Sequence, residues 1–284
     1  MKNYNPKIAL KQRGFTLIEL SVVLLILVGL AGLLLPYVSG FDEDTKNSTS
    51  AANLKAVNNA IVQYETRFRA FPDKFDSLVT TDTTTPALID YFPTAGETTA
   101  PATTHLELCS LTADTLKSLK LAEIDSLYYM KKPADIENAT FDGNDLTAGG
   151  VGANGVVTLS DTATDYSKNV ACIKHASLQA LIVSKMGIEV DGDDLDTDPN
   201  EHENEFVVFG VGQKTQMSGK TLTDAPVYFA NGNDNPTSKY GRFLAVFKVS
   251  KEGKRATYVG ALTPDLKTTA DFLELAHAKT EDDD

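Results

Sequence analysis

A single carboxylate interrupts the longest apolar run of the chain. Residues 13–36 read RGFTLIELSVVLLILVGLAGLLLP, and Glu19 lies only four residues after Phe15, where the run begins. A carboxylate that enters hydrocarbon without a partner costs roughly 2.5–3.5 kcal/mol on insertion scales. The chemistry open to Glu19 is therefore charge pairing, and it needs a cation that can reach it in apolar surroundings.

A second group of candidate residues lies in the acidic loop DGDDLDTDPNEHENE, residues 191–205. Pro199 stands where a calcium-binding EF-hand loop needs glycine, and Glu201 stands where that loop has an apolar residue. The sequence leaves three alternatives open: calcium binding, zinc binding through His202, or a solvated acidic loop. Five oxygen-bearing side chains match the calcium-loop spacing 1, 3, 5, 7, 12 and are the predicted calcium ligands: Asp194, Asp196, Asp198, Asn200 and Glu205.

The cysteines and histidines offer little further chemistry. Cys109 and Cys172 lie 63 residues apart without a CxxC or a Cys/His cluster, which argues against zinc at these thiols. If the body of the protein lies outside the cytoplasm, we expect a disulfide between them; the alternative is two buried thiols. None of the four histidines lies in a nucleophile-elbow or HExxH setting, so we expect no enzymatic activity.

Charge excludes one class of partner. The formal net charge of the 284 residues is −13, and residues 1–14 contain four basic side chains and no acidic one. The rest of the chain is therefore more acidic still, and it should repel the phosphates of nucleic acids. We expect no nucleic acid partner.

The segment that positions Glu19 is long enough to cross a membrane as a helix. The 21 residues from Phe15 to Leu35 would span roughly 31 Å, about one bilayer core. The basic flank predicts that residues 1–14 stay in the cytoplasm and that the body is exported. A cleaved secretory signal would have a shorter apolar region followed by a small-residue cleavage site. A plain signal anchor would explain the length of the run but not Glu19.

The stretch RGFTLIELSVVLLILVGLAGLLLP resembles the N-terminus of type IV prepilins and type II secretion pseudopilins, which carry class III signal peptides. The resemblance implies that a prepilin peptidase cuts after Gly14 and methylates the new amine of Phe15. Glu19 matches the carboxylate of that family, and Pro36 matches its helix-bending proline. The remaining partners that the resemblance implies are other pilin or pseudopilin subunits, an inner-membrane assembly platform and membrane lipid.

The resemblance supplies a partner for the lone acid. Glu19 of an incoming subunit can meet the freed amine of Phe15 on its neighbour, so that each buried charge has an opposite charge beside it. The implied protein is a filament subunit, single-pass in the inner membrane before assembly, with its body in the periplasm or outside the cell. The alternative is a membrane-anchored extracytoplasmic binding module whose acidic loop holds calcium. Pilus and secretion pseudopilus, and major and minor subunit, remain open.

The pattern of the whole chain divides it into four segments. They are a leader peptide at 1–14, a transmembrane and assembly helix at 15–36, an amphipathic continuation at 37–70, and a globular body at 71–284. The predicted fold class is α+β, with the long N-terminal helix packed on a C-terminal antiparallel sheet, as in pilins.

Periodicity predicts the elements of the body. Apolar residues at 54, 57, 61, 64 and 68 form one helix face. A loop is expected at 80–104, a short helix and then a strand within 111–130, a helix over 169–187, and a last helix at 266–278. Strands are expected at 205–211, 226–230, 240–250 and 255–262, with a hairpin turn at Glu252–Gly253.

The resemblance generates a first prediction, which concerns the native N-terminus. We expect mass spectrometry of the protein from its own membranes to show a chain that begins at N-methylated Phe15, because cleavage would follow Gly14. A native chain that begins at Met1 would contradict the assignment of residues 1–14 as a leader.

Overall fold

The computed structural model describes residues 16–80, 85–89, 92–93, 104–129, 155–195, 202–229 and 239–274. The chain divides into two compact units, Met1–Thr45 and Lys46–Asp284. Helix and sheet both occur, with a long helix at the N-terminal side, so the predicted α+β class is confirmed. Three of the predicted calcium ligands, the proposed cleavage site and the end of the last predicted helix lie outside the described residues.

Helix α1 spans Leu17–Phe68 and includes Pro36. It ends where Arg69 adopts a left-handed backbone conformation with φ of 55°, and the Arg69 N–H bonds to the Glu65 carbonyl at 2.7 Å. The predicted apolar face of its second half is confirmed at four of five positions, which are at most 4% exposed: Leu54, Val57, Ile61 and Tyr64. Phe68, the fifth, is 49% exposed because the helix ends there.

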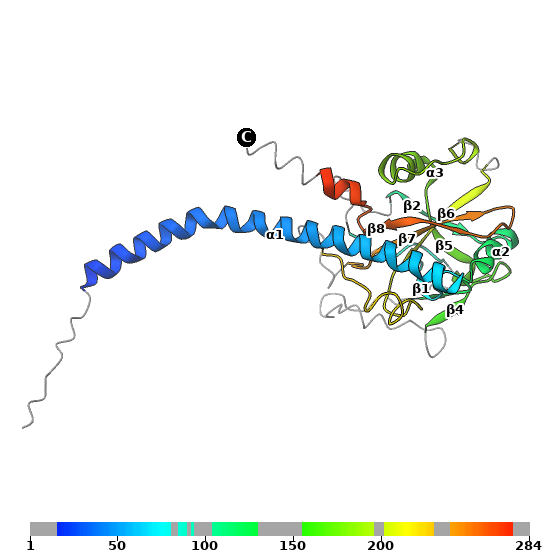
Figure 1. The fold of residues 1–284 in the computed structure, drawn as a ribbon, viewed down its shortest axis with the longest axis horizontal. Coiled ribbons are helices and arrows are strands. Elements are labelled where there is room, and N and C mark those ends of the chain that lie inside the picture. Colours follow the sequence, from blue (N-terminus) through cyan, green and yellow to red (C-terminus); the bar gives the residue numbers. More distant parts are fainter. Residues whose placement is uncertain are drawn as a thin grey trace, which may run out of the picture. The chain divides into compact units, whose positions relative to one another are not determined.

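Among the described residues of the second unit, eight strands form one sheet (Figure 1). Strand β6 is its centre: one edge pairs along its whole length with β7, and the other edge is shared between β5 and β1. All pairs are antiparallel except β1 with β3, so the predicted antiparallel sheet is right in all but one pair. The strands are β1 Phe75–Asp76, β2 Leu106–Ser110, β3 Ser126–Tyr128, β4 Val156–Thr158, β5 Asn169–Ile173, β6 Asn204–Gly210, β7 Leu244–Ser250 and β8 Thr257–Leu262.

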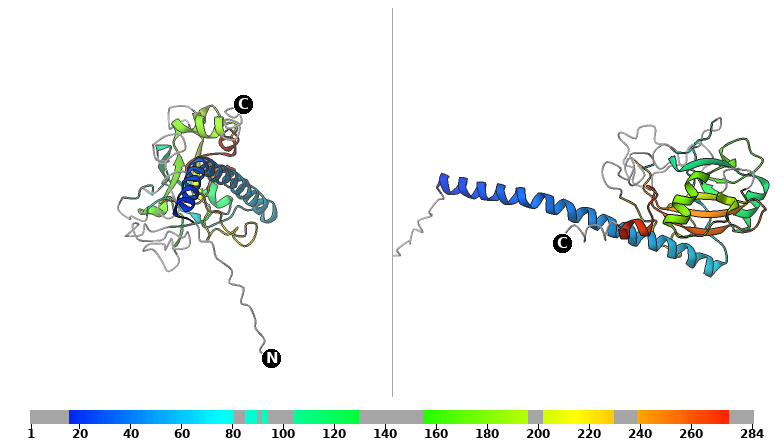
Figure 2. Two further views of the ribbon diagram at one scale, coloured as in Figure 1. Left: turned by 90° about the vertical axis from the view of Figure 1, so that its left-hand side faces the viewer. Right: turned by 90° about the horizontal axis from the view of Figure 1, so that it is seen from above.

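Helices cover both faces of this sheet. The second half of α1 lies along the sheet (Figure 2). Together with helix α2 (Ala113–Leu121) it shares one core cluster with side chains of β5–β8. Helix α3 (His175–Leu178) and the π-helix η3 (Gln179–Lys185) belong to a second cluster, with the alternate side chains of the same strands. This alternation is why strands such as LAVFKVS are apolar at nearly every position.

Three predictions for the body were wrong in part. Residues 169–173 form strand β5 rather than the start of a helix, because both neighbouring strands pair with them. The predicted strand at 226–230 is reduced to one bridge between Val227 and Arg242. The predicted surface loop at 80–104 contains Ile89 and Phe92, both 1% exposed, which pack in the second core cluster.

Polar contacts hold the second half of α1 in one register on the sheet. The Asn58 side-chain oxygen accepts hydrogen bonds from the Tyr258 hydroxyl at 2.6 Å and the Ala261 N–H at 2.9 Å, both on β8. About two turns further along, Glu65 pairs with Arg255 at 2.8 Å. Apolar packing alone would tolerate small shifts along the helix axis, whereas these directional bonds do not.

Asp76 is a carboxylate in the middle of the sheet, and it is 2% exposed. It accepts a hydrogen bond from the Tyr240 hydroxyl at 3.0 Å. Its side chain also occupies the space beside Gly212, where a Cβ atom would lie 2.0 Å from the carboxylate oxygen. Burial raises the pKa of Asp76 from 3.8 to about 7, against the opposing effects of the Tyr240 hydrogen bond and the Arg242 charge.

This pKa predicts that the body loses stability as pH rises toward neutrality. The folded chain holds the Asp76 proton more tightly than the unfolded chain, so the contribution is present below the ordinary carboxyl pKa and is gone above about 7. The free energy of unfolding should fall between about pH 4 and pH 7, by at most ~1.4 kcal/mol per pH unit.

The test is urea unfolding of wild type and Asp76→Asn across this range. Asparagine can still accept the Tyr240 hydrogen bond but does not titrate, so the variant should lack the part of the slope that Asp76 supplies. Asp125→Asn, at an exposed acid, is the matched control and should keep the wild-type slope. Equal slopes for wild type and Asp76→Asn would contradict the prediction.

Candidate functional site

The first turn of α1 holds Glu19 through a reciprocal cap. The Thr16 backbone N–H and the Thr16 hydroxyl both donate to Glu19 Oε2, each at 2.8 Å. In return, the Glu19 N–H donates to Thr16 Oγ1 at 3.3 Å. This is a capping box, which satisfies backbone donors that the start of a helix would otherwise leave unpaired.

The cap restrains the carboxylate but does not neutralise it. Both Thr16 donors are uncharged, and within the described residues both bind Oε2 while Oε1 accepts no hydrogen bond. Glu19 therefore sits at the beginning of the apolar helix in a fixed position, with one oxygen open to a further donor. The pattern T-x-x-E before an apolar run is a known helix-start signature, so the Thr16 contact could have been found from sequence.

Large apolar side chains precede and follow Glu19 along the helix, and they are exposed. Burying one such side chain lowers the free energy by roughly 1.5–3 kcal/mol. An exposed surface made of them therefore favours contact with lipid or with another protein. Those that are about half exposed or more are Leu17, Ile18, Leu20, Val22, Val23, Leu24, Leu25, Ile26, Leu27, Val28 and Leu30. Within the described residues, no helix has the combination of length and mean hydropathy that marks a membrane crossing.

The other predicted assembly residues are only partly described. Gly14 and Phe15 lie outside the described residues, so the cleavage and methylation predictions stay predictions. Pro36 lies within the bounds of α1, and its side chain is not described.

The predicted calcium ligands are not gathered at one point by the described residues. Asp194 is fully buried and accepts bonds from the backbone N–H groups of Glu203 and Asn204 at 3.0 and 2.9 Å, and from the Asn204 amide at 2.7 Å. These contacts stabilise the entry of the chain into β6. Asp196, Asp198 and Asn200 lie outside the described residues.

Glu205 points to the face of the sheet opposite to the one on which Asp194 lies. Its neighbour Asn204 bonds Asp194 beside the second core cluster, and successive strand residues point to opposite faces. Glu205 instead pairs with Lys251 at 3.1 Å, and its Oε2 lies 3.7 Å from the Cys109 sulfur. Glu205, the twelfth position of the motif, is a residue of strand β6, as the predicted strand at 205–211 implies, and the calcium site as a whole stays a prediction.

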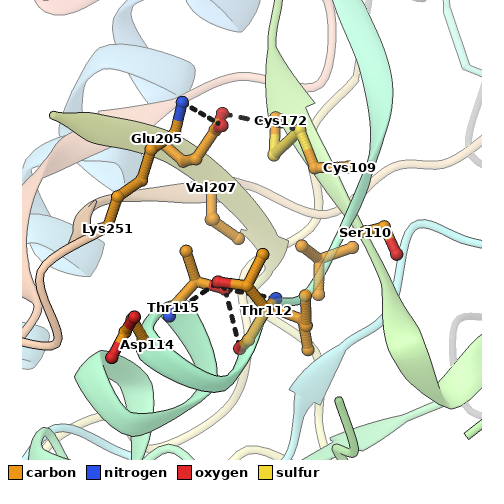
Figure 3. A pocket seen from close by; sticks show the side chains of 11 residues that line it. Cys109, Ser110, Thr112, Asp114, Thr115, Cys172, Glu205, Val207 and Lys251 are labelled. Atoms are coloured by element: carbon orange, nitrogen blue, oxygen red, sulfur yellow. Dashed lines mark hydrogen bonds and ion pairs between the residues drawn. A yellow bond between two sulfur atoms is a disulfide. The ribbon is translucent and has the colours of Figure 1, made fainter. Parts of the chain in front are cut away.

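The predicted disulfide is confirmed. Cys109 on β2 and Cys172 on β5 are bonded, with Cα atoms 5.9 Å apart (Figure 3). The register places Cys109 opposite Val170 and Cys172 opposite Glu107, so the bond runs diagonally between adjacent strands. By the chain-entropy account, closing a loop of 63 residues stabilises the fold by about 4 kcal/mol.

The histidines also gather, although sequence did not predict it. The rings of His175 and His202 stack with centroids 3.8 Å apart, and His105 Nδ1 lies 3.1 Å from the Ser177 hydroxyl. All three lie at the ends of β2, β5 and β6. The stacked rings face each other, an arrangement that does not direct their nitrogen lone pairs to a common point.

A comparison with known protein families matches the same N-terminal segment that contains the Thr16–Glu19 cap. Residues 10–34 match the family defined by the prokaryotic N-terminal methylation motif. This stretch contains the Thr16–Glu19 cap and the exposed apolar residues that follow it. The resemblance to type IV pilins and pseudopilins that the sequence indicated is thereby confirmed.

A relative of this class is the type II secretion system core protein G of Escherichia coli (strain K12). It is 33% identical over 84 residues, which cover 28% of this chain. The chain spans 58% of the length of that relative, and most of the present body has no counterpart in the match. No solved structure matches the chain.

The cap generates a prediction about local stability. Thr16→Ala removes the hydroxyl that accepts from the Glu19 N–H, so the Glu19 amide should exchange its hydrogen about fivefold faster, equivalent to about 1 kcal/mol. Thr16→Ser keeps the hydroxyl and is the matched control. The measurement is amide exchange by NMR on the full chain in detergent micelles. The same exchange rate in both variants would show that the cap does not hold.

Proposed function

We propose that the protein is a structural subunit of a filament of the type II secretion pseudopilus or type IV pilus class, and that it acts by assembly without catalytic turnover. The observation that carries the proposal is the geometry of Glu19: a carboxylate fixed by Thr16 among exposed apolar side chains, with one oxygen open. A carboxylate in this position favours a cationic partner supplied from outside the described chain.

The partner that fits is the N-terminal amine of a neighbouring copy. After cleavage behind Gly14, the amine of Phe15 lies at the end of the same apolar helix, and N-methylation keeps its positive charge. Two helices that pack side by side with an axial offset can place one amine against the next carboxylate. Pairing at that offset neutralises both charges, and other offsets leave two unpaired charges in apolar surroundings.

Two glycines support close packing of helices. An added Cβ at Gly29 or Gly32 would meet no atom of the described chain within 4 Å. The chain's own packing therefore gives no reason for these two small residues on α1. Small residues let a second helix approach closely, which is what lateral assembly requires.

Processing and placement follow from the same proposal. The basic residues before Gly14 hold the leader at the cytoplasmic side, and the apolar run from Phe15 resides in the inner membrane until assembly. The prepilin peptidase and methyltransferase, an inner-membrane assembly platform and further pilin-like subunits are the proposed partners. The confirmed disulfide is consistent with a body in an oxidising compartment.

Of the two filament systems, the similarity to a type II secretion core protein favours the secretion pseudopilus. The second half of α1, packed on an eight-stranded sheet, is consistent with a pilin-like architecture. The alternative of a calcium-binding module receives no support from the described ligands, since Asp194 and Glu205 face opposite sides of the sheet.

The experiment separates the charge of Glu19 from its shape. Glu19→Gln keeps the size of the side chain and an oxygen for the Thr16 cap but removes the charge. We expect the variant to be inserted and cut as the wild type is, and to enter sheared filaments at least about tenfold less, which corresponds to about 1.4 kcal/mol.

Two controls make the result specific. Ser21→Ala changes a polar residue on the same helix whose hydroxyl bonds its own backbone at Ile18, and it should assemble normally. Mass spectrometry of the Glu19→Gln N-terminus shows whether cleavage still occurs. Normal filament entry by correctly cut Glu19→Gln would overturn the charge-pairing proposal.

A further inference from the structure

A pocket opens beside the disulfide on the face of the sheet that α1 and α2 cover. Its volume is about 280 Å³, and its walls come from β2, β5, β6, the start of α2 and Lys251. Figure 3 shows the Glu205 carboxylate between the Lys251 ammonium and the sulfur pair. The pocket thus brings a disulfide, an acid and a base together at a point that solvent can reach.

The two cysteines differ in exposure. Both line the pocket, but Cys172 is fully buried whereas Cys109 is half-buried. A thiolate that enters the pocket can therefore attack the Cys109 sulfur, with Cys172 as the leaving thiolate. The strands do not depend on the disulfide to stay together, because β2 and β5 pair over five residues.

We propose that Cys109, Cys172 and Glu205 form a redox-controlled zinc site, which is closed to metal in the disulfide form and binds Zn²⁺ in the dithiol form. The Sγ atoms of both cysteines and a Glu205 carboxylate oxygen all lie within 4.8 Å of one another. Bond lengths of about 2.3 Å to sulfur and 2.0 Å to oxygen put tetrahedral ligand atoms roughly 3.5–3.8 Å apart. Cys109 Sγ and Glu205 Oε2 are 3.7 Å apart.

Charge favours the same ligand set. Two thiolates and the Glu205 carboxylate carry three negative charges, which the Zn²⁺ ion and the Lys251 ammonium balance. Lys251 lies 3.1 Å from Glu205 Oε1, so Oε2 can face the metal while Oε1 keeps its ion pair. The pocket leaves room for a water molecule as fourth ligand, and soft thiolates with one carboxylate suit zinc rather than calcium.

A dithiol reductant supplies the two electrons that reduce the Cys109–Cys172 disulfide. Its first thiolate bonds Cys109 and releases Cys172; its second thiol then attacks the mixed disulfide, frees Cys109 and closes the reductant's own disulfide. Two electrons and two protons pass to the cysteines. Zn²⁺ then displaces both protons as the two thiolates bind it.

The first experiment asks whether the disulfide is reducible in the folded chain. The full chain in detergent micelles is treated with dithiothreitol, its thiols are counted by alkylation and mass spectrometry, and its near-ultraviolet circular dichroism is recorded. We expect two alkylated cysteines with the near-ultraviolet signal retained. Loss of that signal on reduction would overturn the proposal, because the site requires the paired strands.

The second experiment measures metal binding after the reductant is removed under anaerobic conditions. Co²⁺ serves as a visible probe, and we expect one Co²⁺ per reduced chain, with thiolate charge-transfer absorption that Zn²⁺ abolishes. The oxidised chain should give no such band. Absence of the band in the reduced chain would overturn the proposal.

Single-residue variants test which side chains bind the metal ion. Cys172→Ser should abolish the charge-transfer spectrum of a two-thiolate site, and Glu205→Gln should weaken Zn²⁺ binding by at least about tenfold. Glu203→Gln changes an exposed acid two residues away and is the matched control, with unchanged affinity expected. Unfolding of the oxidised forms of Glu205→Gln and Glu203→Gln checks that each fold is intact. Tight binding by Cys172→Ser, or equal affinity in both glutamine variants, would refute this ligand set.

Discussion

The central constraint on this protein is a negative charge on an apolar helix. Glu19 is fixed at the start of α1 by Thr16, and the large side chains that follow it are exposed. Neither feature would favour a chain that works alone in water, since the apolar surface is uncovered and the acid has only neutral donors within the described residues. Both features favour contact between copies, because a second helix can cover the surface and supply a cation.

The second half of α1 shows how the same helix meets a different requirement. Its apolar face is buried on the sheet, and Asn58 and Glu65 bond to β8 and to Arg255. The chain therefore satisfies this half internally with directional contacts. The first half instead exposes large apolar side chains from Leu17 to Leu30.

Much of this arrangement could be predicted from sequence where the signal is local. The apolar run, the T-x-x-E cap and the 3–4 spacing from Leu54 to Tyr64 each depend on residues a few positions apart. Prediction failed where long-range pairing decided the outcome. Residues 169–173 have a helical pattern but form a strand because β2 and β6 flank them. The pocket at Cys109 joins residues far apart in the chain, so no local pattern marks it.

Three acids of this chain show why an acidic residue in an apolar setting does not identify a function by itself. Asp194 is buried and satisfied by backbone N–H groups at the start of β6, and so its role is local structure. Asp76 is buried with one hydroxyl donor, and burial raises its pKa to about 7, so the fold tolerates it most easily with its proton bound. Glu19 differs from both because its carboxylate is exposed, on a helix whose neighbouring apolar side chains are exposed too. What separates Glu19 from the two structural acids is thus its exposure, since a neighbouring molecule can reach its carboxylate and cannot reach those of Asp76 and Asp194.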